Sequence, residues 1–77
     1  MNLLDAPKEK KFCVLSYKGG KGVSLKLRQL GIMPGRMIKV LRYAPLGGPV
    51  MIDVDGRSVA VGRGIAAHIL IEEAECE

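Results

Sequence analysis

Two clusters of glycine and proline near the middle of the chain constrain its fold more than any other feature. They occupy residues 30–35 (Leu-Gly-Ile-Met-Pro-Gly) and 44–49 (Ala-Pro-Leu-Gly-Gly-Pro), and one apolar segment lies between them. In the first cluster, Gly31 can end a helix in the left-handed conformation, and Pro34-Gly35 suits a type II turn. The prolines of the second cluster exclude a helix there. The pattern predicts a helix end, a sharp turn and a hairpin with a long loop.

The rest of the chain alternates short apolar segments with turn signals. Strands are expected at residues 12–15, 36–43, 50–54, 58–61 and 69–71, with Asp55-Gly56 as a tight hairpin turn. Apolar residues at helical spacing predict a helix of about two turns over 23–30, with Ser24 as its N-cap. The segment 18–22 is expected to be a flexible basic loop, 65–67 a single turn and 72–77 a frayed acidic tail. The pattern is typical of a small all-β barrel or sandwich.

The length and the terminal sequences limit the class of protein. A chain of 77 residues has room for one domain. It has no apolar run of the roughly 18–20 residues that cross a bilayer, and its start has no signal-peptide core. Cys13 and Cys76 do not make a disulfide framework, and both are expected as reduced thiols. We therefore expect a cytoplasmic protein that is not inserted in a membrane.

Positive charge is concentrated in the body of the chain. The net charge is +4, and residues 10–52 hold nine basic and no acidic side chains, whereas 64–77 hold four glutamates and no Lys or Arg. A basic body can meet nucleic acid, anionic lipid or an acidic protein, or can simply keep a small domain soluble. RNA binding generally adds exposed aromatic side chains for base stacking, and only Tyr17 and Tyr43 are candidates. Nucleic acid is therefore not the expected partner, and RNA binding stays an alternative.

The chemical motifs do not predict an active site. Residues 18–24 resemble the variant phosphate-binding loop of partitioning ATPases, but Val23 occupies the position of the lysine that contacts phosphate. Cys13, His68 and Cys76 lack the spacing of metal ligands. Asp53 and Asp55 flank a tight turn rather than a cleft. The sequence predicts no catalytic residue, no metal site and no cofactor, and hence not an enzyme.

The order and spacing of the turn and strand signals resemble the FeoA domain of bacterial and archaeal ferrous iron transport. The resemblance covers about residues 3–71. It rests on the two turn clusters, the apolar strands around them and the alternating residues near the end (Leu27, Leu30, Val50, Ile52, Val54, Gly56, Val59, Val61, Ala66, Ala67, Ile69 and Ile71). It implies an SH3-like five-stranded barrel with one short helix, as a single domain over 1–77 with its core at 3–71.

The resemblance also implies a function. It points to a cytoplasmic accessory protein that binds and modulates FeoB, the membrane Fe²⁺ transporter with a cytosolic GTP-binding domain. The same domain type occurs at the C-terminus of iron regulators of the diphtheria toxin repressor type, which leaves a metalloregulator-type peptide-binding domain as an alternative. Here no helix-turn-helix precedes it, so the free-standing accessory protein is expected. Direct Fe²⁺ carriage through Cys76 and the tail is a third possibility.

The chain departs from the family pattern at one place. Relatives usually have Leu-Arg after the fourth strand and an acidic residue before the alanine of the final turn. Here these positions hold Val61-Gly62 and Ile65, with Arg63 as a displaced substitute for the arginine.

We expect the partner in a cleft between the short helix and the loop at 46–48, because SH3-like barrels commonly take peptide there. The predicted contacts are five apolar side chains and two cations at the rim (Leu27, Leu30, Met33, Pro34, Leu46, Lys26 and Arg28). Each of the five apolar side chains could equally belong to the core, and for Leu27 and Leu30 the core is the favoured role. Met37 and Met51, on the outer faces of their strands, predict a tendency to self-associate into a homo-oligomer.

Overall fold

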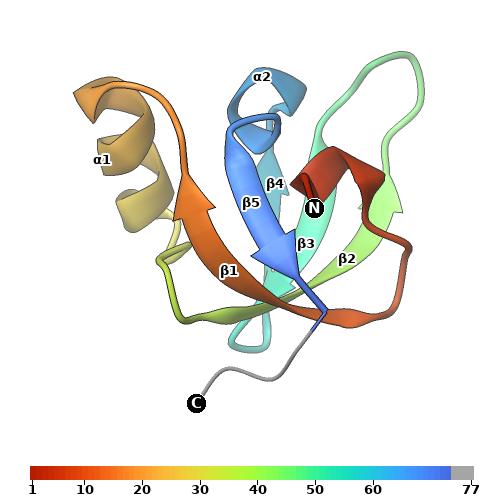
Figure 1. Ribbon diagram of the computed structural model, residues 1–77. Helices are drawn as coiled ribbons and strands as arrows, with labels where there is room; N and C mark the ends of the chain where they lie inside the picture. Colours follow the sequence, from red (N-terminus) through yellow and green to blue (C-terminus); the bar gives the residue numbers. More distant parts are fainter. Residues whose placement is uncertain (74–77) are drawn as a thin grey trace.

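The computed structural model describes residues 1–73, which form one strongly curved antiparallel sheet flanked by short helices (Figure 1). The strands are β1 (Lys11–Tyr17), β2 (Met37–Tyr43), β3 (Val50–Val54), β4 (Arg57–Val61) and β5 (Ile69–Glu72). The helices are the 3₁₀ turn η1 (Leu3–Asp5), α1 (Lys21–Gln29) and α2 (Arg63–Ala66). The strand order is β4-β3-β2-β1-β5. The five-stranded barrel with one short helix that the sequence predicts is confirmed.

The core lies inside the curve of the sheet and is built by alternation along the strands. In β3 the residues at positions 50, 52 and 54 are buried while the two between them are half-buried. Cross-strand pairs such as Ile38 with Val54 and Val40 with Ile52 place apolar side chains on the same inner face. Bulges between Val14 and Ser16 and between Val40 and Arg42 shift the register and strengthen the curvature.

The chain end at Met1 closes the outer edge of β5. The Met1 ammonium donates to the carbonyl oxygen of Ile71 at 3.0 Å, and the Ile71 amide donates to the Met1 carbonyl at 2.7 Å. Leu3 then enters the core with none of its surface exposed. This pairing satisfies an edge that would otherwise be open to other chains.

The helix begins earlier than the sequence indicates. Gly20 is the N-cap of α1, without a side-chain cap, and Ser24 lies inside the helix, where its hydroxyl donates to the Tyr17 hydroxyl at 3.5 Å. The prediction of Ser24 as N-cap is therefore wrong, and the basic loop of residues 18–22 is shorter than expected, since its last two residues are helical. The Ser24 amide donates to the Gly20 carbonyl at 3.2 Å, which closes the first helical turn ahead of Ser24.

Two expectations about the ends of the sheet also change. Glu72, assigned to the tail, is the last residue of β5. The expectation of a reduced thiol is wrong for Cys13, which is not a free thiol. The register pairs Cys13 with Glu72, beside the end of the described chain, a proximity that the sequence does not indicate. Cys76 lies outside the described residues. No helix within residues 1–73 is long and apolar enough to cross a bilayer.

Candidate functional site

The structure does not bring the predicted contact residues into one cleft. In Figure 1, α1 and the loop between β2 and β3, which carries Leu46, lie on opposite sides of the sheet. Leu27 is fully buried, in agreement with its alternative role in the core, and Leu30 and Met33 are half-buried. Pro34 and Leu46 are exposed. The predicted set therefore divides into a surface at the end of α1 and a separate surface at the 44–49 loop.

The turn at residues 30–35 is closed from both sides. The Gly31 amide donates to the Arg28 carbonyl at 3.1 Å and the Ile32 amide to the Leu27 carbonyl at 2.9 Å, the pattern of a Schellman cap with Gly31 at φ +84°. Gly35 has φ +88°, as the predicted type II turn requires. These bonds direct Ile32 into the core, where none of its surface is exposed.

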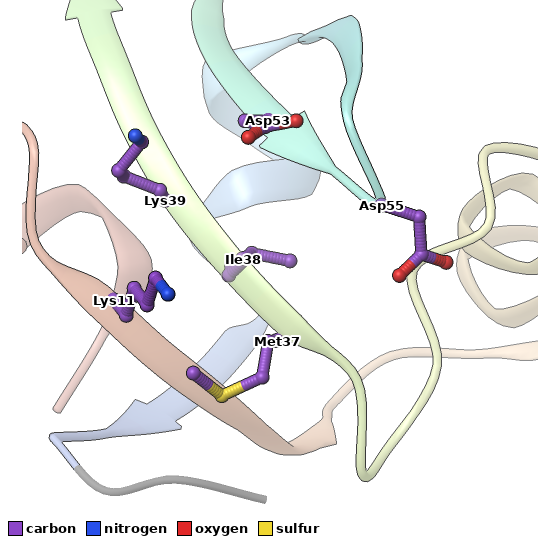
Figure 2. A pocket seen from close by; sticks show the side chains of 6 residues that line it. All are labelled: Lys11, Met37, Ile38, Lys39, Asp53 and Asp55. Atoms are coloured by element: carbon purple, nitrogen blue, oxygen red, sulfur yellow. The ribbon is translucent and has the colours of Figure 1, made fainter.

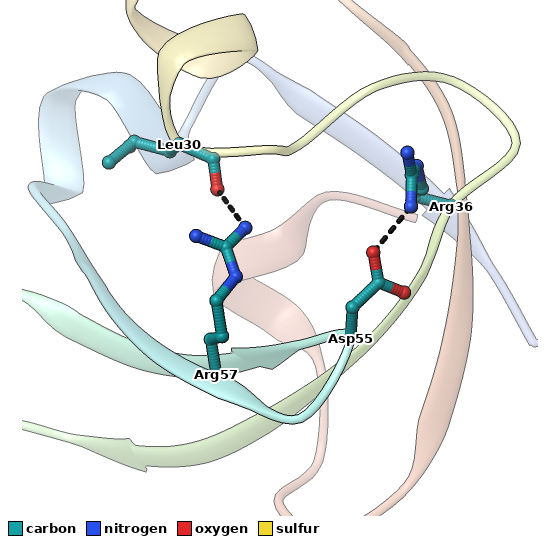
Figure 3. A network of polar contacts seen from close by, with 4 residues as sticks. All are labelled: Leu30, Arg36, Asp55 and Arg57. Carbon is teal, nitrogen blue, oxygen red and sulfur yellow. Dashed lines mark hydrogen bonds and ion pairs between the residues drawn. The ribbon is translucent and has the colours of Figure 1, made fainter.

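Two arginines tie this turn to the hairpin between β3 and β4 (Figure 3). Arg36 forms an ion pair with Asp55, and Arg57 Nη2 lies 3.4 Å from the Leu30 carbonyl oxygen. Asp55 and Gly56 have φ +53° and +82°, as the predicted tight hairpin turn requires. The end of α1 and the β3–β4 hairpin thus form one connected corner.

The side chain of Arg63 braces the 44–49 loop. Arg63, at the start of α2, donates through Nε to the Gly48 carbonyl at 3.0 Å and through Nη2 to the Ala44 carbonyl at 3.3 Å. Its guanidinium carbon also lies 5.9 Å from the centre of the Tyr43 ring. Within the loop, the Ala44 amide donates to the Pro49 carbonyl at 3.0 Å. The loop therefore has a defined shape although most of it is exposed.

Tyr43 anchors the base of this loop to the N-terminal segment. Its hydroxyl donates to the Ala6 carbonyl oxygen at 2.6 Å, with the Leu3 carbonyl oxygen at 3.1 Å. Burial raises the pKa of Tyr43, as does the negative charge of Asp5, while the positive charge of Arg63 acts in the opposite direction. Tyr17 is half-buried as well. Neither ring is therefore an open stacking platform of the kind that RNA binding uses.

One end of the barrel is rich in basic side chains, with Asp5 of η1 as an acidic side chain close to it. The Lys18 amide donates to the His68 carbonyl at 2.7 Å, which joins the loop before α1 to the segment after α2, and Arg63 joins α2 to the 44–49 loop. These three segments lie along the same end of the molecule in Figure 1. Residues 18–21, 42–50 and 62–70 contain no Asp or Glu. We call this surface the basic end.

A pocket of about 180 Å³ lies elsewhere, on the outer face of the sheet between β1, β2 and β3 (Figure 2). Its lining is mixed, with two lysines, two aspartates and one half-buried methionine, together with a residue of β2 that is buried in the core (Lys11, Lys39, Asp53, Asp55, Met37 and Ile38). Lys39 also pairs with Glu9 at 3.8 Å. Opposite charges therefore face one another around a small apolar floor. Met37 contributes to this floor, and both Met37 and Met51 are half-buried.

Within residues 1–73 no three His, Cys, Asp or Glu side chains gather as metal ligands would. His68 is half-buried between α2 and β5, with its amide donating to the Ile65 carbonyl at 3.0 Å. The tail residues from Ala74 onward, including the cysteine invoked for direct Fe²⁺ carriage, lie outside the described residues.

Sequence reasoning underestimated one residue. The sequence indicates Arg63 only as a displaced substitute for an arginine of the family pattern. The structure shows that Arg63, the first residue of α2, braces the 44–49 loop. The signal that could have identified it is its place as the single basic residue in the acid-free segment 62–71.

Comparison with known proteins gives consistent matches along the chain. The model of the FeoA domain family matches residues 1–73. The putative Fe(2+) transport protein A of Methanocaldococcus jannaschii is 39% identical over 62 residues, which are 80% of this chain and 73% of that protein. A crystal structure of an iron uptake regulatory protein (FeoA) superposes with a TM-score of 0.86 at 32% identity, covering 94% of this chain and 95% of the other.

The fold also occurs inside a longer regulator. The manganese-activated repressor ScaR, in its apo form, superposes with a TM-score of 0.87 at 20% identity, covering 96% of this chain and 35% of the repressor chain. At this identity the likeness concerns the fold alone. It agrees with the expected SH3-like barrel that free-standing proteins and metal-dependent repressors share.

Proposed function

The chain belongs to the FeoA family of small proteins associated with Fe²⁺ transport, and from this premise we propose that it is a non-enzymatic cytoplasmic adaptor. In this proposal the barrel docks on the cytosolic region of a FeoB-type transporter. Docking changes the transporter only if the barrel binds one nucleotide or gating state more tightly than the other. The modulation is then a shift in the populations of these states.

The acid-free exposed surface of α1 is the observation that supports docking on another protein. Lys26 and Arg28 lie in its last turn, where cations also complement the negative end of the helix dipole, and both are exposed. None of the ion pairs formed among residues 1–73 involves α1. Uncompensated cations of this kind raise the rate at which an acidic partner is met.

The remaining contacts follow from exposure. Pro34 and Leu46 are accessible to a partner, while Leu30 and Met33 offer only part of their surface and Leu27 holds α1 on the core. The turn that holds Pro34 is tied to the β3–β4 hairpin, and in Figure 1 this hairpin lies at the opposite end of the barrel from the 44–49 loop. Contacts by both groups would require a partner that extends along the whole length of the barrel, as a multidomain cytosolic region can.

A titration of the purified barrel against the cytosolic region of the transporter, loaded with a GTP analogue or with GDP, tests the proposal. We expect binding to both forms with different dissociation constants, and an association rate that falls as salt rises. The double variant Lys26→Gln, Arg28→Gln keeps the helix propensity and removes two charges. It should slow association at low salt by about threefold to tenfold and leave dissociation nearly unchanged.

The matched control is Lys39→Gln, which removes one charge from the outer face of the sheet, away from α1. It should change the association rate much less. Absence of binding to either nucleotide form at high micromolar concentration, with the barrel folded, would contradict docking on this region. Equal affinity for the two forms would contradict the modulation.

A further inference from the structure

We propose that Leu46 is an anchor residue that inserts into an apolar pocket with an acidic rim on the partner protein, and that Arg63 is the positioning residue that holds the 44–49 loop in the shape that presents it. This inference rests on the proposed docking function and assigns the residue that dominates it. It moves the centre of the contact from the end of α1 to the basic end.

The exposure of Leu46 is the first observation. Its relative accessibility is 104%, the largest among the exposed apolar side chains within residues 1–73, of which Leu25 reaches 57% and Leu15 45%. A leucine that touches nothing contributes no burial to the fold. Its full apolar surface is instead available to a partner, where burying it is favourable.

The backbone of Leu46 is the second observation. Its φ is +58°, a conformation that costs a residue with a Cβ atom roughly 1 kcal/mol or more and that glycine or asparagine adopts more easily. Gly47 follows at φ +72°. The fold therefore carries the cost of a left-handed leucine without any intramolecular contact of its side chain that repays it. Strained backbone of this kind clusters at ligand-binding and switch sites.

The bracing of the loop is the third observation. Arg63 reaches two carbonyls of the loop, those of Ala44 and Gly48, which lie on either side of Leu46. The Gly48 amide closes the tip by donating to the Pro45 carbonyl at 3.1 Å. A loop that is ordered before binding loses less conformational entropy when the partner arrives. Arg63 thus acts on binding through the shape of the loop.

The charge around the loop identifies the chemistry of the partner. Arg42 is exposed just before the loop, Arg63 lies beneath it, and residues 37–52 contain no Asp or Glu, so that these two cations outnumber Asp5, the acidic side chain whose charge reaches Tyr43 at the base of the loop. An apolar pocket rimmed by carboxylates complements this arrangement. The pocket of about 180 Å³ on the outer face of a second copy fits less well, because Lys11 and Lys39 line it beside the aspartates. We therefore assign the pocket that receives Leu46 to another protein.

The test measures affinity and dissociation rate for the cytosolic region of the FeoB-type transporter, with the full chain immobilised. Leu46→Asn removes the apolar side chain and keeps a residue that tolerates positive φ. We expect at least tenfold weaker binding, mainly through faster dissociation, with an unchanged melting temperature. Leu15→Thr removes another exposed leucine, from a strand, and should alter affinity less than twofold. Leu46→Gly, which relieves the strained backbone, should weaken binding like Leu46→Asn without lowering the melting temperature.

The test of Arg63 must distinguish the effect of its two hydrogen bonds from the effect of its positive charge. Arg63→Lys keeps the charge but cannot bond both carbonyls through one planar group. We expect it to weaken binding about as much as Arg63→Ala, roughly fivefold, and both variants to show faster backbone motion at Gly47 and Gly48 by ¹⁵N relaxation. Full affinity in Arg63→Lys would overturn the positioning role.

The outcomes separate the two proposals. If the unaltered chain binds and Leu46→Asn binds equally well, the anchor is wrong while the docking function stands. If the unaltered chain does not bind either nucleotide form, the docking function fails and the anchor fails with it. If Leu46→Asn instead dissociates a dimer of the chain alone in sedimentation experiments, the occupant is a second copy and the inference is overturned.

Discussion

The two turn clusters contain the same kinds of residue and direct them to opposite environments. In the first, at 30–35, Ile32 has no exposed surface, and in the second, at 44–49, Leu46 is fully exposed. Both clusters use glycine at positive φ to turn the chain, at Gly31 and Gly35 in one and at Gly47 in the other. Turn chemistry alone therefore does not decide whether a cluster serves the core or the surface.

The difference lies in what each turn is tied to. The first is bonded to α1 through the Leu27 and Arg28 carbonyls and to β1 through the Gly35 amide, which donates to the Val14 carbonyl at 2.8 Å. The second is held mainly by backbone hydrogen bonds between its own residues, such as that from the Ala44 amide to the Pro49 carbonyl, and by the bonds from Arg63. The first turn is thus a part of the barrel wall, and the second is a braced projection from it.

The largest expected effect contrasts the two apolar side chains directly. Ile32→Ala should lower the free energy of unfolding by about 2–5 kcal/mol, because it leaves a cavity in the core. Leu46→Ala should change it by less than about 0.5 kcal/mol, since no contact is lost. Urea denaturation followed by circular dichroism measures both. Similar losses in the two variants would mean that Leu46 is packed in solution and would break the comparison.

The next effect contrasts two glycines at positive φ. Gly31→Ala should cost about 1–2 kcal/mol of unfolding free energy, from the strained backbone and from a Cβ atom that would lie 2.5 Å from Arg57 Nη2. Gly47→Ala meets only open space, so it should cost about 1 kcal/mol from the backbone alone. Thermal unfolding of the two variants tests the order, and a greater loss at Gly47 would contradict it.

A smaller effect contrasts the arginines that brace the two clusters. Arg63→Ala removes two hydrogen bonds to carbonyls and should cost about 1 kcal/mol, nearly independent of salt. Arg36→Ala removes an exposed ion pair with Asp55 and should cost about 0–1 kcal/mol, less at high salt. Chemical denaturation at low and high ionic strength distinguishes them. A strong salt dependence for Arg63→Ala would indicate that its charge, rather than its bonds, holds the loop.

The smallest effect appears only in alkaline solution and concerns Tyr43, at the base of the second loop. Because its folded pKa is raised above the ordinary value of 10.0, its contribution to stability is fully present below about pH 10. It is lost as pH rises through the folded pKa, since the unfolded tyrosine releases its proton first. Tyr43→Phe should show a shallower decline of stability above pH 10 than the unaltered chain. An identical decline would show that Tyr43 is not the responsible group.

Sequence patterns were sufficient for the elements whose determinants are local. The positive φ values at Gly31, Gly35 and Asp55-Gly56 follow from the residue types, and the inward positions of β3 follow from strict alternation. Five strands and a short helix followed from these signals, and the family resemblance supplied their arrangement.

The parts that the sequence did not predict depend on contacts between distant segments. Residues 21 and 22 are helical although they are exposed, contain a glycine and follow an N-cap without a side-chain bond, so no local signal marks this start of α1. The cleft expected between Leu46 and α1 follows from where SH3-like barrels commonly bind peptide. No local sequence pattern indicates that the strands of the barrel lie between Leu46 and α1. Arg63 bonds to Gly48 and Ala44, which precede it by 15 and 19 positions in the sequence, and the periodicity of the sequence does not indicate such contacts.

The most direct test of the account is an NMR titration of the ¹⁵N-labelled chain with the cytosolic region of the FeoB-type transporter. The account predicts that the amides of Leu46, Gly47 and Gly48 and the Arg63 side chain undergo the largest shift changes or broadening. The amides of Gly31 and Ile32, inside the barrel wall, should change little. Large changes around residues 30–36 with an unaffected 44–49 loop would contradict the claim that the second cluster carries the partner contact.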